Sequence, residues 1–397
     1  MGAGCRLSRS DPPIIMVMDI VVRSVRGLEW VAAAEARGRL SATVQRVRHR
    51  EVWLRAARLP AELAGLRVAD DVFFHAGNVP HVGHTRQALS IIARGTSSID
   101  WAAAAKESGR SQGPFDVVGS FLGRRNYNRF ELEDAVGQAV AAQTRWAYLQ
   151  RRPDRRPVGE RALTIRVHIE DDEAALGIRL ADRPLHRRAW KRVDVPGTLH
   201  PPVAAALVLA AGLRPASVLA DPFCGAGTVG IEALLTEPTA RVFLSDLRHE
   251  SVAATLRNAS SARVQDRLLI ATADAARPPL RSASVDRLVT NPPWSRLVEP
   301  EGLLRERWEP FVETVPKVLR NGGRGVLLVD MGSLDAFAMM AERAGCAVVG
   351  SIALSVSGAW VAMLLLGTSP GPTIDPYGLF GGELAAALAD HKIEAGG

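Results

Sequence analysis

The sequence predicts an α/β protein with a Rossmann-like, doubly wound domain in its second half and an α+β first half. Two observations predict the doubly wound sheet. Short apolar strands alternate with helical segments from residue 217 onward, and a glycine-rich turn joins the first of these strands to the first helix. Repeated strand–helix units favour a parallel sheet with helices on both faces. The first half mixes short strands and helices without this repeat.

The individual elements follow from apolar periodicity and from stop signals. In the second half, strands are expected at 217–220, 241–245, 268–271, 285–290 and 325–329, and helices at 230–236, 250–262 and 306–319. The last helix is expected to end at Asn321-Gly-Gly323. In the first half, strands are expected at 19–24, 115–118 and 164–169, helices at 28–37 and 131–142, and residues 44–54 alternate with a period near two.

Segments rich in proline and polar residues punctuate these blocks. Residues 151–157 hold four arginines and two prolines and are expected to form a loop. Residues 191–202, with three prolines and a glycine, are expected to link the two halves. The polar start of the chain is expected to be a disordered extension, and residues 370–376 to open a C-terminal tail.

Composition excludes several classes of protein. The chain has 397 residues, of which 47% are hydrophobic and 23% charged, an ordinary globular balance. Cys5, Cys224 and Cys346 are scattered in no metal-binding spacing, so we expect a reducing compartment without disulfides. No apolar stretch approaches the roughly 20 residues that a bilayer needs, and the start lacks a signal-peptide core. We therefore expect a cytoplasmic monomer with no membrane partner.

Histidines give no clear metal signal. His81 and His84 lie close together in the sequence but have no third ligand nearby. They are interpreted as ordinary loop histidines, and no metal site is expected.

The net charge of +7 is unevenly spread. Residues 1–200 carry 32 basic and 22 acidic side chains, whereas residues 201–397 carry 17 and 20. A basic first half suggests a polyanion partner such as nucleic acid. A bias towards arginine without any such partner would produce the same imbalance, because only four of the 49 basic residues are lysines.

A glycine-rich loop follows the first strand of the second half, in the segment Asp221-Pro-Phe-Cys-Gly-Ala-Gly-Thr-Val-Gly230. Gly225, Gly227 and Gly230 give the spacing G-x-G-x-x-G, which lets backbone approach a ligand closely. Dinucleotide enzymes share this spacing, so the glycines alone do not identify the cofactor.

Acidic residues at the ends of the strands favour S-adenosylmethionine. Asp221 would face the cationic methionine part of that cofactor, whereas it would repel a dinucleotide pyrophosphate. Asp246 is expected to accept the ribose hydroxyls and Asp274 to accept from the adenine amino group; a helix cap or a turn is the less favoured alternative for both residues. The predicted cofactor-binding residues are Asp221, Pro222, Phe223, Cys224, Gly225, Gly227, Thr228, Asp246 and Asp274.

The segment Asn291-Pro-Pro-Trp294 follows the fourth strand, where a parallel sheet opens its ligand crevice. The Asn291 oxygen and the carbonyl between the prolines can accept both hydrogens of an exocyclic amino group, and so direct its lone pair at a methyl donor. Proline fixes φ and brings no competing N–H. Trp294 offers a flat face for a base. The predicted catalytic residues are therefore Asn291, Pro292, Pro293 and Trp294.

Together, residues 221–228 and 291–294 resemble the Rossmann-fold methyltransferases that make N2-methylguanosine in RNA. Arg26-Gly-Leu-Glu29 resembles the opening of their ferredoxin-like domain, and residues 115–142, with Gly123-Arg-Arg-Asn126, resemble a THUMP domain. Leu185-His-Arg-Arg188 and His200-Pro201 resemble the approach to their catalytic domain. The domains implied are an extension (1–16), a ferredoxin-like domain (17–70), a THUMP-like domain (71–182), a methyltransferase domain (183–370) and a tail (371–397).

The resemblance also implies that the first half grips the 3′ end and acceptor stem of a tRNA. The RNA-binding candidates are Arg124, Arg125, Asn126, Arg129, Arg151, Arg152, Arg155 and Arg156. Guanidinium groups pair well with phosphates, but any one of these arginines is equally compatible with a solvated surface. Family members often have Tyr or Phe where Trp294 stands and Gly where Ser295 stands, so the shape of the target pocket is less defined.

The resemblance favours a tRNA guanine-N2 methyltransferase. An adenine-N6 methyltransferase acting on RNA or DNA uses similar Asn-Pro-Pro chemistry, and a guanine of 23S rRNA is another target. A non-catalytic RNA-binding protein is disfavoured by the intact Asp221, Asp246 and Asn291. An NAD-dependent enzyme is disfavoured by Asp221 and by the Asn-Pro-Pro-Trp segment.

Overall fold

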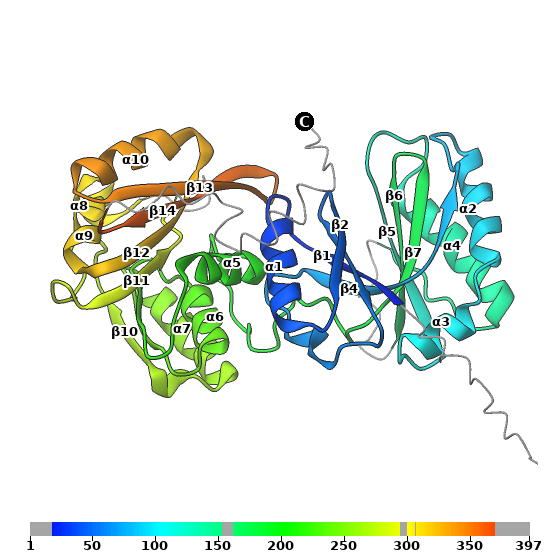
Figure 1. The fold of residues 1–397 in the computed structure, drawn as a ribbon, viewed down its shortest axis with the longest axis horizontal. Coiled ribbons are helices and arrows are strands. Elements are labelled where there is room, and N and C mark those ends of the chain that lie inside the picture. Colours follow the sequence, from blue (N-terminus) through cyan, green and yellow to red (C-terminus); the bar gives the residue numbers. More distant parts are fainter. Residues whose placement is uncertain (1–17, 153–161, 294–299, 306, 370–397) are drawn as a thin grey trace, which may run out of the picture.

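The computed structural model describes residues 18–152, 162–293, 300–305 and 307–369. These residues form an α/β protein with two mixed, seven-stranded sheets. Figure 1 shows the two sheets towards opposite ends of an elongated molecule, with helices α1 (Glu29–Arg39) and α5 (Pro201–Ala211) between them. No helix in these ranges is long and apolar enough to cross a membrane.

The first sheet has the strand order β2-β3-β1-β4-β7-β6-β5. Its strands are β1 (Met18–Arg23), β2 (Thr43–Arg48), β3 (Glu51–Ala56), β4 (Asp71–Pro80), β5 (Phe115–Phe121), β6 (Leu163–Glu170) and β7 (Glu173–Arg179). The start of β4 pairs with β1, and most of β4 pairs with β7. The first half is therefore one continuous sheet, and the expected boundary after residue 70 falls where this shared strand begins.

Helices α2 (Gln87–Ser97), α3 (Trp101–Glu107) and α4 (Arg129–Thr144) cover the sheet near β4 and β5. Helix α4 begins with a capping box, in which the Asn128 side chain accepts from the backbone N–H of Glu131 and the Glu131 carboxylate accepts from that of Asn128. Ile92, Leu132 and Val136 pack against the sheet with no exposed surface.

The second sheet has the order β10-β9-β8-β11-β12-β14-β13. Its strands are β8 (Val218–Asp221), β9 (Arg241–Asp246), β10 (Leu268–Thr272), β11 (Val285–Thr290), β12 (Leu319–Asp330), β13 (Ala347–Val356) and β14 (Ala359–Gly367). The five strands that we predicted, β8 to β12, run parallel. Strand β14 is antiparallel to both β12 and β13.

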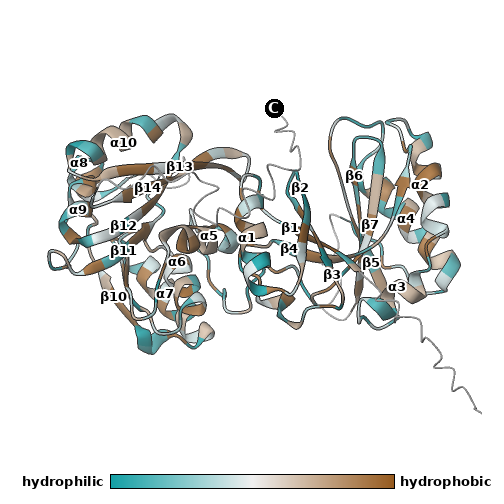
Figure 2. Ribbon diagram, in the orientation of Figure 1, coloured by the Kyte–Doolittle hydropathy of each residue, from teal (hydrophilic) through white to brown (hydrophobic). Residues whose placement is uncertain are grey.

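Helices cover both faces of this sheet. Helices α5, α6 (Thr228–Thr236) and α7 (His249–Ala262) lie on one face, and α8 (Glu309–Val312), α9 (Thr314–Val318) and α10 (Leu334–Arg343) lie on the other. Neighbouring strand residues divide between the two faces: Val289 joins the core under α5, and Leu288 joins the core under α8. Figure 2 shows α5 coloured largely as hydrophobic, as expected for a helix buried on nearly all sides.

The helix expected at 306–319 is confirmed in part, but its single continuous form and its stop at Asn321-Gly-Gly323 are wrong. The helical part consists of the two short helices α8 and α9, and the glycines lie inside β12. Pro316 has no N–H to continue an α-helical ladder from α8 into α9. Gly322 has a φ of +73°, which glycine adopts readily, so the chain turns within the strand instead of ending a helix there.

Several elements had no counterpart in our sequence prediction: β4, β7, α2, α3, α5, α10, β13 and β14. Residues 44–54, which alternate in sequence, form the hairpin strands β2 and β3, and Arg50 in their turn has a φ of +59°. The strand β14 is a continuous apolar run, because each of its faces packs under helices.

A buried ion triad joins the first half to the helix that follows the glycine-rich loop. Glu232 on α6 is fully buried, and its carboxylate accepts from Arg67 Nε at 2.6 Å and from Arg188 Nε at 2.8 Å. Arg188 also donates to the backbone carbonyl of Arg67. The triad therefore connects the segment before β4, the segment after β7 and helix α6 at one point.

At a second contact, the first half packs against the β13–β14 hairpin. Arg26 O accepts from Ser355 N at 2.9 Å, and the Arg26 guanidinium lies 4.7 Å from the centre of the Trp360 ring. A Cβ on Gly27, whose φ is +91°, would lie 2.3 Å from Ala353 O. Only glycine permits this close approach of the two backbones.

Candidate active site

A cavity of about 430 Å³ opens at the carboxyl ends of β8, β9, β10 and β11. The predicted residues that line it are Asp221, Pro222, Phe223, Cys224, Gly225, Thr228, Asp246, Asp274, Asn291, Pro292 and Pro293. Residues separated by up to 72 positions in the sequence, from Asp221 to Pro293, thus meet at one edge of the sheet. Trp294 lies outside the described residues.

The glycine-rich loop is held tightly against its neighbours. Gly227 has a φ of +79°, and a Cβ there would lie 2.7 Å from Thr255 Cγ2. A Cβ on Gly230 would lie 2.6 Å from Leu244 Cδ2, so this glycine lets α6 pack closely on β9. The backbone N–H of Gly225 donates to Asp246 Oδ2 at 2.9 Å, which links the loop to the end of the second strand.

Asp221 is a buried carboxylate at the end of β8. Its Oδ1 accepts from Thr290 Oγ1 at 2.6 Å and from the Phe223 N–H at 3.1 Å. Burial raises the pKa of Asp221 to about 7, and the nearby Asp246 carboxylate contributes to this increase. A cationic group in the cavity beside Asp221 would therefore stabilise the ionised form of its carboxylate.

Asp246 and Asp274 both face the cavity and both support a turn. Asp246 Oδ1 accepts from the Arg248 N–H at 3.0 Å, and Asp274 Oδ1 accepts from the Ala276 N–H at 2.9 Å. Asp274 Oδ2 also accepts from the Leu303 N–H at 3.1 Å. The bonds to Arg248 and Ala276 are short-range turn bonds of the kind that these sequence positions also suggested, whereas the bond to Leu303 spans 29 positions.

The segment Asn291-Pro-Pro293 continues directly from β11 into the cavity wall. Thr290, the residue before it, is fully buried and donates to Asp221. This bond fixes the end of β11 against the end of β8, and so sets the Asn-Pro-Pro segment relative to the glycine-rich loop. Thr290 is a positioning residue that no sequence motif indicated.

The rest of the cavity wall comes from parts of the chain that the sequence motifs do not include. The linker contributes residues 196–200, and the β13–β14 hairpin contributes Val356, Ser357 and Ala359. Pro300, Glu301 and Leu304 close another side. The first half contacts this same hairpin through Arg26 and Gly27.

The side chains that line the cavity fit S-adenosylmethionine. A cavity carboxylate at Asp221 would balance a cationic amino-acid part, and the carboxylates of Asp246 and Asp274 would accept from hydroxyl and amino groups. Thr228 Oγ1 is buried at the cavity wall without a hydrogen-bond partner among the described residues. The position of this hydroxyl beside the loop leaves it available to a bound ligand.

Cys224 and Phe223 contribute shape to the loop. Cys224 is buried, and burial raises the pKa of its thiol well above the usual range. The Phe223 ring packs edge to face on Phe311 with a centroid separation of 4.9 Å. Neither residue carries a charge into the cavity at neutral pH.

The RNA-binding candidates lie in two groups. Arg124, Asn126 and Arg129 are exposed near the start of α4. Arg125 donates to the carbonyls of Gly83 and Asp171 and so holds two loops together. Arg151 pairs with Asp116 at 3.7 Å and Arg152 with Asp134 at 2.6 Å, while Arg155 and Arg156 lie outside the described residues.

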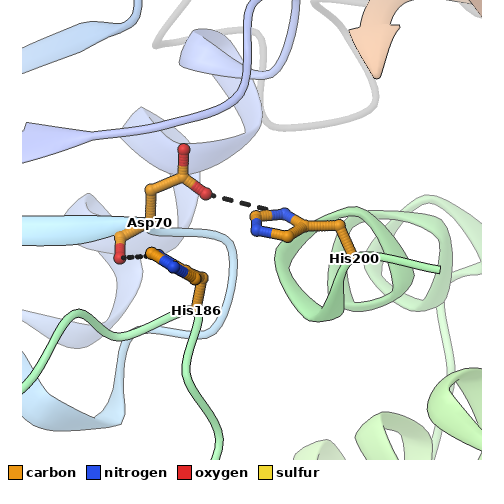
Figure 3. Close-up of side chains that lie close together, drawn as sticks. All are labelled: Asp70, His186 and His200. Atoms are coloured by element: carbon orange, nitrogen blue, oxygen red, sulfur yellow. Dashed lines mark hydrogen bonds and ion pairs between the residues drawn. The ribbon is translucent and has the colours of Figure 1, made fainter. Parts of the chain in front are cut away.

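Asp70, His186 and His200 lie together where the two halves meet (Figure 3). Their ligand atoms are all within 4.8 Å of one another, and this is a donor set that can hold a metal ion. His186 Nδ1 is 3.1 Å from Asp70 O, and His200 Nδ1 is 3.7 Å from Asp70 Oδ1. Arg50 already pairs with the Asp70 carboxylate at 3.1 Å.

Burial lowers the pKa of His200 to about 4, so its ring is neutral at pH 7. His200 also lines the main cavity and immediately precedes α5. The cluster therefore ties the start of β4, the linker and the start of α5 together beside the active-site cavity. The segments that hold His186 and His200 were noted only as part of the family resemblance, and Asp70 lies more than 100 positions before them in the sequence.

The strand order, the loop between β8 and α6, and the Asn-Pro-Pro segment after β11 define a Rossmann-fold methyltransferase domain. Residues 188–358 match the model of the UPF0020 family, described as RMKL-like, methyltransferase domain. This part of the chain is therefore similar to that family of methyltransferase domains.

Known relatives point in the same direction. A tRNA (guanine(6)-N2)-methyltransferase of Thermus thermophilus is 34% identical over 218 residues, which cover 54% of this chain and 62% of that relative. The crystal structure of TrmN from Thermus thermophilus is 26% identical, with a TM-score of 0.69 over 88% of this chain and 99% of that one. The resemblance to guanine-N2 methyltransferases that we predicted is thus confirmed.

The fold extends to more distant proteins. SMU.472, crystallised as a complex with SAH, is 16% identical and has a TM-score of 0.68, covering 89% of this chain and 99% of that one. At this identity the match shows a shared fold alone.

Proposed function

We propose that the chain is a tRNA methyltransferase that transfers a methyl group from S-adenosylmethionine to the exocyclic N2 of a guanosine in the acceptor-stem region. The observation that carries the proposal is the placement of Asn291-Pro-Pro293 in the same cavity as the glycine-rich loop, with Thr290 bonded to Asp221 between them. The names of the similar relatives supply the substrate and the target atom.

Bound S-adenosylmethionine would supply an electrophilic methyl group on a sulfonium centre. Asp221, Asp246 and Asp274 would hold its polar parts, and the loop from Phe223 to Thr228 would lie against it. Burial of Asp221 keeps water away from the charged end and strengthens the attraction between the carboxylate and a cation.

Asn291 performs the central step that the chain itself contributes. Its side-chain oxygen and the carbonyl of Pro292 accept the two hydrogens of the guanine amino group. The nitrogen lone pair then leaves conjugation with the ring and points along the direction of attack. On transfer, the carbon–sulfur bond would break and the neutral thioether would leave, while the nitrogen would release one of its two protons to solvent. This proton loss needs no strong general base, so most of the rate comes from positioning.

In this proposal the first half grips the tRNA. Residues 17–70 form a ferredoxin-like domain and residues 71–182 a THUMP-like domain, and the methyltransferase domain spans 183–370. The basic excess of the first 200 residues supports an electrostatic grip on phosphates. A tRNA substrate also supports a cytoplasmic location.

The direct test is nucleoside analysis. The purified chain is incubated with S-adenosylmethionine and an unmodified tRNA transcript, and the digested product is examined by mass spectrometry. We expect N2-methylguanosine, and we expect tRNA from a deletion strain to lack one such residue. Formation of N6-methyladenosine, or of no methylated nucleoside, would contradict the proposal.

The raised pKa of Asp221 predicts that cofactor affinity depends on pH. The ionised carboxylate is the form that attracts a cation, and with a pKa of about 7 it becomes protonated as the pH falls. The affinity for S-adenosylmethionine should therefore be about tenfold lower at pH 6 than at pH 8. Calorimetry across this range measures the change.

Two variants serve as controls for this pH dependence. Asp221→Asn should bind more weakly and with almost no change between pH 6 and pH 8. Asp335→Asn removes an exposed carboxylate on α10, outside the cavity, and should behave like the parent chain. An unchanged pH profile in Asp221→Asn would assign the dependence to another group.

A further inference from the structure

A second cavity, of about 280 Å³, lies between the first sheet and the linker that leads into the methyltransferase domain. Seven of its thirteen lining residues are basic and two are acidic. We call it the linker cleft and define it by Arg151, Arg183, Arg187, Lys191 and Arg192. A cavity with this excess of positive charge attracts anionic groups.

The acidic residues of the linker cleft do not cancel its charge. Asp116 pairs with Arg151 at 3.7 Å, and Asp182 pairs with Arg110 at 2.6 Å. Two further lining arginines hold the structure together: Arg179 pairs with Asp71, and Arg188 pairs with Glu232. The positive charge in excess therefore comes from the other basic residues that line the cleft, which are Arg183, Arg187, Lys191 and Arg192.

Arg187 and Arg192 are the lining residues best suited to bind a ligand. Both are exposed, and neither forms an ion pair with a carboxylate of the described residues. Arg192 makes one long hydrogen bond, from Nε to Ser261 Oγ at 3.4 Å. A phosphate could replace that contact with a bidentate, charge-assisted pair.

The backbone that carries these arginines is fixed in place. The Asn258 side chain on α7 accepts from the N–H of Arg192 at 2.8 Å and from that of Val193 at 3.0 Å. The same amide donates to Ala226 O in the glycine-rich loop at 3.0 Å. The Asn258 side chain therefore fixes the position of the linker cleft relative to the glycine-rich loop.

The linker cleft adjoins the active-site cavity, because Lys191 lines both. Lys191 pairs only with Asp194 at 2.5 Å among the described residues, and the Asp194 side chain is 69% exposed. The Lys191 side chain is 16% exposed, so the exposed Asp194 carboxylate is the partner that a phosphate entering the cleft would displace. Positive charge therefore continues from the cleft to the mouth of the cavity that holds Asn291.

We propose that the linker cleft binds backbone phosphates of the RNA next to the target nucleotide, with Arg187, Lys191 and Arg192 as the contacting residues. This inference rests on the proposed function. The phosphates held here set the strand at the mouth of the cavity, so the target base reaches Asn291 without base-specific contacts in the cleft.

The test is the double variant Arg187→Ala/Arg192→Ala in the full chain, measured with an unmodified tRNA transcript. We expect its RNA affinity to fall on the order of tenfold near physiological salt, because two phosphate contacts are lost. The slope of log affinity against log salt should become shallower by about 1.5. The affinity for SAH should stay within twofold of the parent chain.

The matched control is Arg281→Ala/Arg343→Ala, which removes two exposed arginines of the methyltransferase domain that line neither cavity. It lowers the net charge equally and should leave RNA affinity and salt slope unchanged. If both double variants lost RNA affinity equally, the loss would be an effect of net charge, and the assignment of RNA binding to the linker cleft would be wrong.

The two proposals fail in distinguishable ways. If the parent chain methylates tRNA and the Arg187→Ala/Arg192→Ala variant binds tRNA with unchanged affinity and slope, the cleft inference is wrong and the proposed function stands. If the parent chain neither binds tRNA nor transfers a methyl group to it, the proposed function is wrong and the cleft inference falls with it.

Discussion

Replacing Asn291 by alanine is expected to lower the rate of methyl transfer by on the order of 10²-fold or more. The amide oxygen accepts a hydrogen from the target amino group most strongly when the nitrogen becomes tetrahedral. Its removal therefore acts on the transition state and leaves ground-state binding nearly intact. Single-turnover methylation of a tRNA transcript measures the effect on the chemical step.

Companion measurements make the Asn291 result specific. Affinities of Asn291→Ala for SAH and for tRNA should remain within about twofold, since neither ligand depends on this contact for binding. Asn291→Asp should lose less activity than Asn291→Ala, because a carboxylate also accepts both amino hydrogens. A fully active Asn291→Ala enzyme would remove the basis of the proposed mechanism.

Replacing Glu232 by alanine is expected to destabilise the protein by about 3–5 kcal/mol. The carboxylate is fully buried between Arg67 and Arg188, and its loss leaves two guanidinium groups without their anionic partner. Arg67 already has one buried N–H group without a hydrogen-bond partner among the described residues. Urea unfolding followed by circular dichroism measures the loss.

Two further variants separate the charge effect from simple loss of packing. Glu250→Ala removes an exposed carboxylate from the start of α7 and should change stability by less than about 0.5 kcal/mol. The triple variant Arg67→Met/Glu232→Leu/Arg188→Met replaces the triad with apolar side chains and should recover much of the loss. If the triple variant were no more stable than Glu232→Ala, uncompensated charge would not be the cause.

Because the triad joins the first half to α6, its variants also bear on substrate placement. Helix α6 starts at the glycine-rich loop, and Arg188 donates to Arg67 in the first half. Glu232→Gln keeps the shape of the side chain and removes its charge. This variant weakens the contact between the first half and α6. The rate of tRNA methylation should therefore fall more than the affinity for SAH.

Local sequence patterns predicted the central strands and helices of the second half and its two contiguous motifs. Alternating strands and helices predicted β8 to β12 with α6 and α7, because periodicity and capping act over a few residues. The glycine-rich loop and Asn291-Pro-Pro293 were found because each motif is contiguous and its chemistry needs those residue types in that order. Parallel topology then predicted that their strand ends would meet.

Only the tertiary structure decided the rest of the site. The Thr290–Asp221 bond, the β13–β14 wall, the Glu232 triad and the linker cleft each join residues that are far apart in the sequence. Such pairings depend on the packing of whole elements, and no local propensity encodes them. The break between α8 and α9 is a local effect of Pro316. Asn321-Gly-Gly323 falls within β12 because Leu319 and Arg324, on either side of it, both pair with β11.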